Sequence, residues 1–308
     1  MQIYLPIADL PVNVFVILAM GLAVGFISGM FGIGGGFLMT PLLIFLGITP
    51  AVAVASVTSH IAASSMSGAS SYWRRRAIDL ALAFMLLAGG IVGTAFGVWL
   101  FTFLRTIGQL DITIGVSYVV LLGIVGALMV ADSVRAIIRA RQGKPIELRR
   151  PGSHTWIHGL PFKLRFKRSR IYVSAIPVWG IGFLIGFIGA VMGIGGGFLL
   201  VPLLIYVLRV PTSTVIGTSM VLTLVTMASA TVMHAVTNHL VDALLALILM
   251  VGGVIGAQFG ARAGQKMSGE RLRLLLGLLV LAVGIRFALN LILPPETLYS
   301  IRLLDTNL

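Results

Sequence analysis

The sequence predicts an all-α, polytopic membrane protein with two inverted-topology repeats, each containing a broken or re-entrant helix at a Gly-Ile-Gly-Gly-Gly motif. Of the 308 residues, 58% are hydrophobic and only 10% are charged, whereas about a quarter of a soluble domain is charged. Residues 25–44 return as residues 186–205, with 14 of 20 positions identical. Glycine and proline interruptions at matching places in two apolar halves are typical of transporters built from repeats.

Apolar runs bounded by glycine, proline and charge predict five segments in each half. In the first half they cover residues 12–31, 34–47, 51–73, 78–104 and 112–134. In the second half they cover residues 172–192, 195–208, 212–236, 241–265 and 272–293. The second segment of each half is too short to cross alone, because a span needs about 20 residues. We expect each to be a half-helix that forms, with the preceding segment, a pair without net crossing. The predicted organisation is a first repeat over 1–134, a basic cytoplasmic loop over 135–170 and a second repeat over 171–308.

Basic residues predict which side of the membrane each loop faces. Eleven of the 22 Lys and Arg residues lie in segment 135–170, and loops rich in these residues are typically cytoplasmic. The third segment ends at residues 74–76, all arginine, whereas its counterpart ends in the uncharged run 237–240. The fourth segments show the opposite bias, so the halves should face opposite ways, with both termini outside. The net charge of +13 then reflects topology, and no nucleic-acid partner is expected. The loop should contact anionic lipid headgroups, and regulation or partner binding by it stays open.

The glycine motifs, residues 32–36 and 193–197, allow three interpretations. Glycines four residues apart let helices pack closely in lipid. A nucleotide-binding loop is excluded, because Phe37 and Phe198 occupy the last glycine position of G-x-G-x-x-G. In the interpretation that we favour, three glycines unwind the helix and present backbone N–H groups at the start of the next half-helix, which attracts anions. An inverted pair would direct two such ends at one site.

The predicted substrate-binding site combines these glycines with hydroxyls of the following segments. The pairs Thr58-Ser59 and Thr218-Ser219 lie at nearly equivalent positions, and neutral hydroxyl donors would hold an oxyanion without trapping it. For any one hydroxyl, the alternative role is a bond to a carbonyl of its own helix. The predicted site consists of Gly34, Gly35, Gly36, Thr58, Ser59, Gly195, Gly196, Gly197, Thr218 and Ser219.

Few ionisable groups lie inside the predicted segments, which restricts the mechanism. His60 is a candidate proton relay, although a buried, hydrogen-bonded histidine is the commoner role. Asp79 and Asp242 begin matching helices, where a carboxylate offsets the helix dipole. The segments contain no carboxylate pair, metal-spaced histidine set or nucleophilic triad, and the chain has no cysteine. We therefore expect no enzyme activity, cofactor or metal. No Walker A sequence is present, so transport should use an ion or potential gradient, with H⁺ as one candidate coupling ion.

The doubled motif resembles that of the TauE/SafE family of sulfite exporters. The resemblance extends from about Gly21 to Leu293. It is carried by Gly29, Gly32, Gly34, Gly35, Gly36, Phe37 and Pro41, by Gly193, Gly195, Gly196, Gly197, Phe198 and Pro202, and by the two hydroxyl pairs. It implies an integral inner-membrane protein that transports sulfur oxyanions such as sulfite, or organosulfonates, outward. The chain departs from the family where Ser28-Gly29 stands opposite Gly189-Ala190, and its central basic loop is longer than usual.

Residues and resemblance together predict a secondary transporter that moves a small sulfur-containing anion, such as sulfite or an organosulfonate, across the inner membrane. Its expected partners are that anion and the lipid bilayer, and a homodimer is one option for its assembly. Two alternatives stay open. A passive anion channel could use the same half-helix ends, and a membrane scaffold or sensor could recruit a partner through the basic loop.

Overall fold

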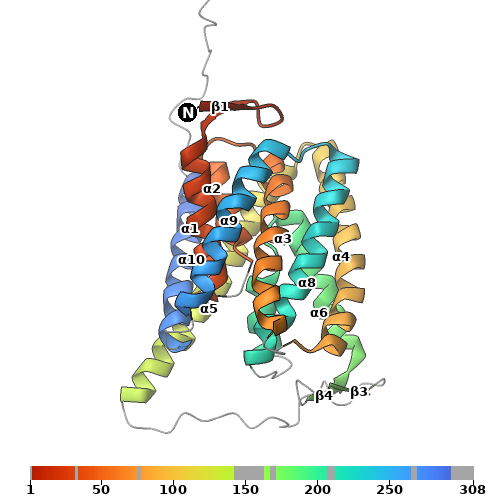
Figure 1. Ribbon diagram of the computed structural model, residues 1–308, viewed down its shortest axis with the longest axis vertical. Coiled ribbons are helices and arrows are strands. Elements are labelled where there is room, and N and C mark those ends of the chain that lie inside the picture. Colours follow the sequence, from red (N-terminus) through yellow and green to blue (C-terminus); the bar gives the residue numbers. More distant parts are fainter. Residues whose placement is uncertain are drawn as a thin grey trace, which may run out of the picture.

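The computed structural model describes residues 2–31, 34–74, 78–141, 163–166, 171–206, 212–264 and 269–292, which form a bundle of long helices (Figure 1). The helices of the first half are α1 (Val14–Phe31), α2 (Gly36–Phe45), α3 (Pro50–Arg74), α4 (Leu80–Thr106) and α5 (Leu110–Arg141). Those of the second half are α6 (Ala175–Met192), α7 (Gly197–Tyr206), α8 (Thr212–Met233), α9 (Ala243–Gly264) and α10 (Gly269–Ile292), and the π-helix η2 (His234–Asn238) continues α8. Each helix coincides with a predicted segment, so the all-α fold is confirmed.

The fifth predicted segment ends at residue 134, but the helix α5 extends beyond that residue. This helix runs on to Arg141, because no glycine or proline follows before Gly143 and residues 135–141 include three arginines and two alanines, which are good helix formers. The short strands β3 (Lys163–Phe166) and β4 (Ile171–Ser174) pair antiparallel just before α6. Residues 142–162 and 167–170 of the predicted loop lie outside the described residues.

A second β-hairpin, β1 (Gln2–Leu5) with β2 (Leu10–Asn13), precedes α1. Its turn is hydrogen-bonded to the second half: the backbone N–H groups of Ile7 and Ala8 donate to Asp242 Oδ2 at 3.0 and 3.4 Å. The other carboxylate oxygen of Asp242 accepts from the first turn of α9, and Asp79 accepts in the same way from Leu82 of α4. Both aspartates therefore cap their helices, as the sequence predicts.

The helices pack in pairs that join the two halves. α3 packs against α8 in the middle of the bundle, α1 against α9, α4 against α6, and α5 against α10 (Figure 1). α3 also contacts α9, and α8 contacts α4. Exchanging each helix for its counterpart in the other half reproduces this set of pairs.

Glycines bring the paired helices into backbone contact. A Cβ added to Gly256 of α9 would lie 2.1 Å from the Leu22 carbonyl oxygen, and one added to Gly93 of α4 would lie 2.0 Å from that of Phe183. Only glycine allows so close an approach. Glycines of these helices therefore serve close helix packing in lipid. Successive glycines along α9 meet successive turns of α1, and those along α4 meet successive turns of α6. Each of the two pairs is therefore parallel.

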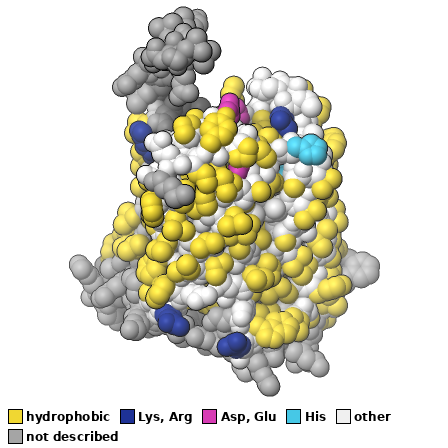
Figure 2. Space-filling model, turned by 45° about the horizontal axis from the view of Figure 1, so that its top comes forward, with side chains coloured by type: hydrophobic (Ala, Val, Ile, Leu, Met, Phe, Trp, Pro, Cys, Tyr) yellow, Lys and Arg dark blue, Asp and Glu magenta, His cyan; other side chains and the backbone are white. Residues whose placement is uncertain are grey.

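The outer surface of the bundle suits a lipid environment. Among the described residues, six helices are long and apolar enough to cross a membrane. Large side chains such as Phe84, Trp99 and Leu128 are more than half exposed on them. On the face shown in Figure 2, hydrophobic side chains cover the middle of the molecule, and basic and acidic side chains lie toward its two ends. The serine-rich α3 is not one of the six and packs against α8 and α9. The chain is thus a multi-pass membrane protein.

Candidate anion site at the two helix breaks

In each half, the helical backbone stops at the glycine motif and starts again a few residues later. α1 ends at Phe31 and α2 begins at Gly36, while α6 ends at Met192 and α7 begins at Gly197. The glycines at positions 34, 35, 195 and 196 have φ values between 65° and 85°. This left-handed backbone is open to glycine and strained for other residues, which is why three consecutive glycines interrupt the helix here.

The two breaks lie against one another inside the protein. A Cβ added to Gly36 would lie 2.5 Å from the Gly193 carbonyl oxygen and 2.8 Å from the carbonyl carbon of Ile194. Thr40 of α2 donates its hydroxyl to that Gly193 oxygen at 3.2 Å. The rings of Phe37 and Phe198, the residues that follow the motifs, stack with centroids 5.1 Å apart. The motifs, 161 residues apart in the sequence, thus form one central structure.

Two buried hydroxyls without a hydrogen-bond partner adjoin this centre. Among the described residues, Ser65 Oγ of α3 and Thr223 Oγ1 of α8 are buried side-chain atoms that lack a partner, and each residue is 1% exposed. Both residues flank Gly34, since a Cβ at this glycine would lie 3.6 Å from Ser65 Oγ and 3.2 Å from the methyl carbon Cγ2 of Thr223. A buried hydroxyl without a partner is costly. At a binding site, a ligand can supply the missing partner.

The first turn of α2 adds backbone donors beside these hydroxyls. Among the described residues, no side chain caps α2, whose N-cap is Gly35. The N–H groups of Leu38 and Met39 already donate to the Gly35 carbonyl oxygen, so only the N–H groups that precede them in the chain could donate to a ligand. An uncapped helix N-terminus carries a partial positive charge and attracts anions. The arrangement can hold a small anion between one helix end and two hydroxyls.

Comparisons with known proteins agree with this architecture. The family model described as sulfite exporter TauE/SafE matches residues 17–287. The chain belongs to this family. It is similar to the "Probable membrane transporter protein YunE" of Bacillus subtilis (strain 168), with 24% identity over 88% of this chain and 96% of the relative. It is also similar to a "Probable membrane transporter protein" of Xylella fastidiosa (strain 9a5c), with 29% identity over 89% of this chain and 94% of the relative. No solved structure matches the chain.

This TauE/SafE protein is therefore a membrane transporter, but the hydroxyl pairs predicted to bind its substrate have protein partners. Thr58 Oγ1 donates to the Ala55 carbonyl oxygen at 2.7 Å, and Ser59 Oγ to that of Ser56 at 2.6 Å. In α8, Ser219 Oγ donates to the Ile216 carbonyl oxygen, and Thr218 Oγ1 accepts from the Asp79 N–H at 3.2 Å. Their part in substrate binding stays a prediction. The unpartnered hydroxyls at the breaks lie farther along the same two helices.

His60 lies between α3 and α9 and is fully buried. Its Nδ1 is 2.7 Å from the Leu249 carbonyl oxygen of α9, and its Nε2 has no partner among the described residues. Because a carbonyl only accepts, we assign the proton of the neutral ring to Nδ1. The free acceptor at Nε2 is compatible with proton transfer, and the relay stays a prediction.

Hydrogen bonds join α4 to η2, the continuation of α8, at the end of the bundle where both α4 and α8 end (Figure 1). We call His234, Asn238, Thr102 and Arg105 the Asn238 cluster. Asn238 Oδ1 lies 3.0 Å from Thr102 Oγ1, and the Asn238 carbonyl oxygen accepts from Arg105 Nη1 at 3.0 Å. Its Nδ2 lies 3.2 Å from His234 Nδ1, and His234 Nε2 lies 3.1 Å from the Ala190 carbonyl oxygen. Sequence reasoning missed this cluster, whose residues lie in two helices far apart in the chain, α4 and η2.

Proposed function

We propose that this protein is a secondary transporter that carries a small sulfur oxyanion, such as sulfite or an organosulfonate, outward across the inner membrane. The observation that carries the proposal is that Ser65 and Thr223 flank the Gly34 break with buried hydroxyls that have no hydrogen-bond partner in the part of the chain that the structure describes. A negatively charged oxygen would accept from both hydroxyls and from the start of α2 at once. The donors are neutral, which allows the ion to leave again because no opposite charge holds it.

We propose further that the two halves have inverted topology. α1 is parallel to α9, and α4 is parallel to α6. Within the first half, α1 and α4 cross in opposite directions. The corresponding first helices of the two halves, α1 and α6, therefore also cross in opposite directions, which supports the inverted topology. In Figure 1, α1 starts at the end of the bundle where β1 lies, whereas α6 starts at the opposite end, near β3 and β4. Arg74, Arg141 and Arg262 stand at helix ends that are cytoplasmic in this proposal. Transport would then expose the central site alternately to the cytoplasm and to the periplasm, through one opening, or mouth, on each side.

We expect Ser65→Ala combined with Thr223→Val to lower sulfite flux in proteoliposomes by about tenfold or more. The reason is that each hydrogen bond to a charged group contributes about 1.5–3 kcal/mol. The matched control is Ser64→Ala with Thr226→Val. These neighbours are equally buried, but their hydroxyls already donate to carbonyls of their own helices. The control should keep wild-type flux.

Wild-type flux from the Ser65→Ala, Thr223→Val protein would contradict the proposed site. A steady electrical current too large for a conformational cycle, recorded from the unmodified protein in a planar bilayer, would instead favour a channel.

A further inference from the structure

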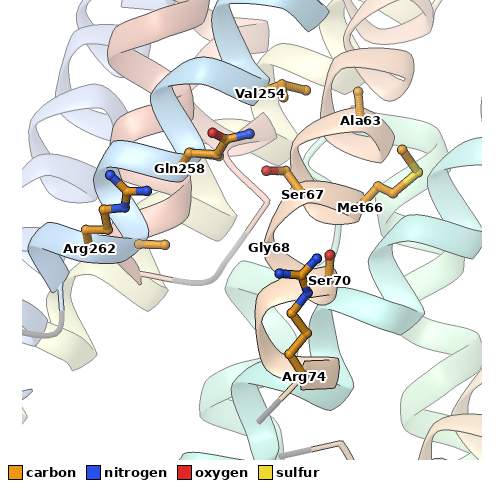
Figure 3. A pocket seen from close by; sticks show the side chains of 11 residues that line it. Ala63, Met66, Ser67, Gly68, Ser70, Arg74, Val254, Gln258 and Arg262 are labelled. Carbon is orange, nitrogen blue, oxygen red and sulfur yellow. The ribbon is translucent and has the colours of Figure 1, made fainter.

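A groove of about 770 Å³ lies between α3 and α9, toward the ends of these helices. Figure 3 shows Gln258 of α9 and Ser67 of α3 directed toward one another across it, with Arg74 and Ser70 farther along α3. Arg262 lines the other wall, one turn beyond Gln258. Small residues form much of the groove wall and leave space between the two helices: Ala63, Gly68, Ala257 and Ala261.

The described lining of the groove is positively charged. It contains two arginines, one from each helix, and no aspartate or glutamate. Both arginines are exposed. Two cations that face one space repel each other, and an anion between them would turn this repulsion into attraction. Guanidinium groups bind oxyanions through paired N–H donors, and the amide of Gln258 and the hydroxyls of Ser67 and Ser70 are further donors.

The groove leads toward a buried polar atom. His60, Ser67 and Arg74 are seven residues apart in turn along α3, a spacing that keeps them near one face of the helix. The groove wall residue Val254 follows Gly253, and a Cβ on Gly253 would lie 2.2 Å from His60 Cε1. The groove thus approaches the ring whose Nε2 lacks a partner among the described residues. A groove whose lining adjoins a buried polar group suits a travelling solute better than a lipid headgroup held at the surface.

We propose that this groove is a capture site, in which Arg74 and Arg262 draw an oxyanion from the cytoplasm before it reaches the helix breaks. The identity of the ion and the sidedness rest on the proposed function. The ligand is an anionic group with several acceptor oxygens, such as a sulfonate or sulfite. The volume accommodates such an ion with part of its hydration, since one water occupies about 30 Å³ in the liquid. The arginines therefore raise the local anion concentration and the rate of entry.

The test uses the absence of cysteine from the chain. Ser67→Cys places a single thiol in the groove, and inside-out vesicles of phosphatidylcholine present the cytoplasmic face. We expect a sulfonate-bearing methanethiosulfonate reagent to modify this thiol faster than a trimethylammonium-bearing one. Adding Arg74→Gln or Arg262→Gln should lower the ratio of the two rates by about fivefold each at low salt, and 1 M NaCl should lower it without any substitution. Arg135→Gln on α5, outside the groove, is the charge control and should leave the ratio unchanged.

Occupancy is tested with methanesulfonate, whose neutral analogue of similar shape is dimethyl sulfone. Methanesulfonate should slow the labelling of Ser67→Cys, and dimethyl sulfone should not. Equal rates for the two reagents, or equal effects of the two solutes, would overturn the capture site. Slower labelling that depends only on phosphatidylglycerol in the vesicles would assign the groove to a lipid headgroup and overturn capture of a soluble anion. The readout does not require transport, so it is separate from the test of Ser65 and Thr223.

Discussion

Replacing Gly36 with alanine should reduce transport to about a tenth or less and lower the free energy of unfolding by about 1–3 kcal/mol, as overpacking of a close contact does. A Cβ at this position would lie 2.5 Å from the Gly193 carbonyl oxygen and 2.8 Å from the Ile194 carbonyl carbon. These are backbone atoms, so they cannot rotate away as a flexible side chain can. The φ angle of Gly36 is outside the left-handed region, so alanine fits the local backbone. The Cβ would also lie 2.3 Å from Ile61 Cδ1, but this atom ends a flexible side chain that can move, so the effect mainly reports the contact between the two breaks.

The matched control is Gly180→Ala in α6, where a Cβ would meet no atom within 4 Å. Alanine there should keep wild-type flux and stabilise the helix slightly, by about 0.5–1 kcal/mol relative to glycine. Flux per folded protein and the thermal unfolding midpoint in detergent separate a damaged site from a failure to fold. If Gly36→Ala behaves like Gly180→Ala in both measurements, the breaks do not depend on their mutual contact.

Several helix boundaries could be predicted because glycines that interrupt a helix, or charged residues that end an apolar run, lie at them. Consecutive glycines separate α1 from α2 and α6 from α7, and arginines follow α3 and lie near the end of α9. The hairpin β1–β2 was missed because four-residue strands are too short to show a period. The end of α5 was misplaced because the apolar pattern stops before the helix does.

The binding residues could be predicted only in part, because their exposure depends on packing between distant helices. Ser59 and Ser65 both belong to the hydroxyl-rich sequence of α3, and the sequence does not say which of them has a partner. The structure shows that the Ser59 hydroxyl donates to its own helix, while Ser65 meets Gly34 and has no partner among the described residues. The contact of Arg105 with Asn238 joins residues 133 positions apart, and no local pattern reports such a pair.

If transport alternates between two openings as proposed, Asn238→Ala should favour the state in which the protein is open to the periplasm between α4 and α8. The substitution removes the side chain that lies within hydrogen-bonding distance of both Thr102 and His234, and His234 is fully buried. A buried polar group left without its partner costs about 1–3 kcal/mol, which corresponds to about fivefold or more in the population of the open state. The cost falls on the closed state, because water can satisfy these groups once the mouth is open.

The reporter is Ala230→Cys, a single thiol at a fully buried position one turn before His234 on α8. We expect a membrane-impermeant thiol reagent, added to the periplasmic side, to label it about fivefold faster or more when Asn238→Ala is also present. The control is Thr237→Ala, since Thr237 is exposed and lies outside the Asn238 cluster. Unchanged labelling would mean that the cluster does not hold this mouth closed.

The same substitution also distinguishes a transporter from a channel, because the opposite mouth can be followed through Ser67→Cys. In alternating access the two mouths are coupled, so opening one must close the other. Asn238→Ala should then slow the labelling of Ser67→Cys from the cytoplasmic side while it speeds that of Ala230→Cys from the periplasmic side. A rise at Ala230→Cys with no fall at Ser67→Cys would leave both mouths open at once. Such a protein would conduct its anion down the gradient, and the carrier mechanism would have to be abandoned in favour of a pore.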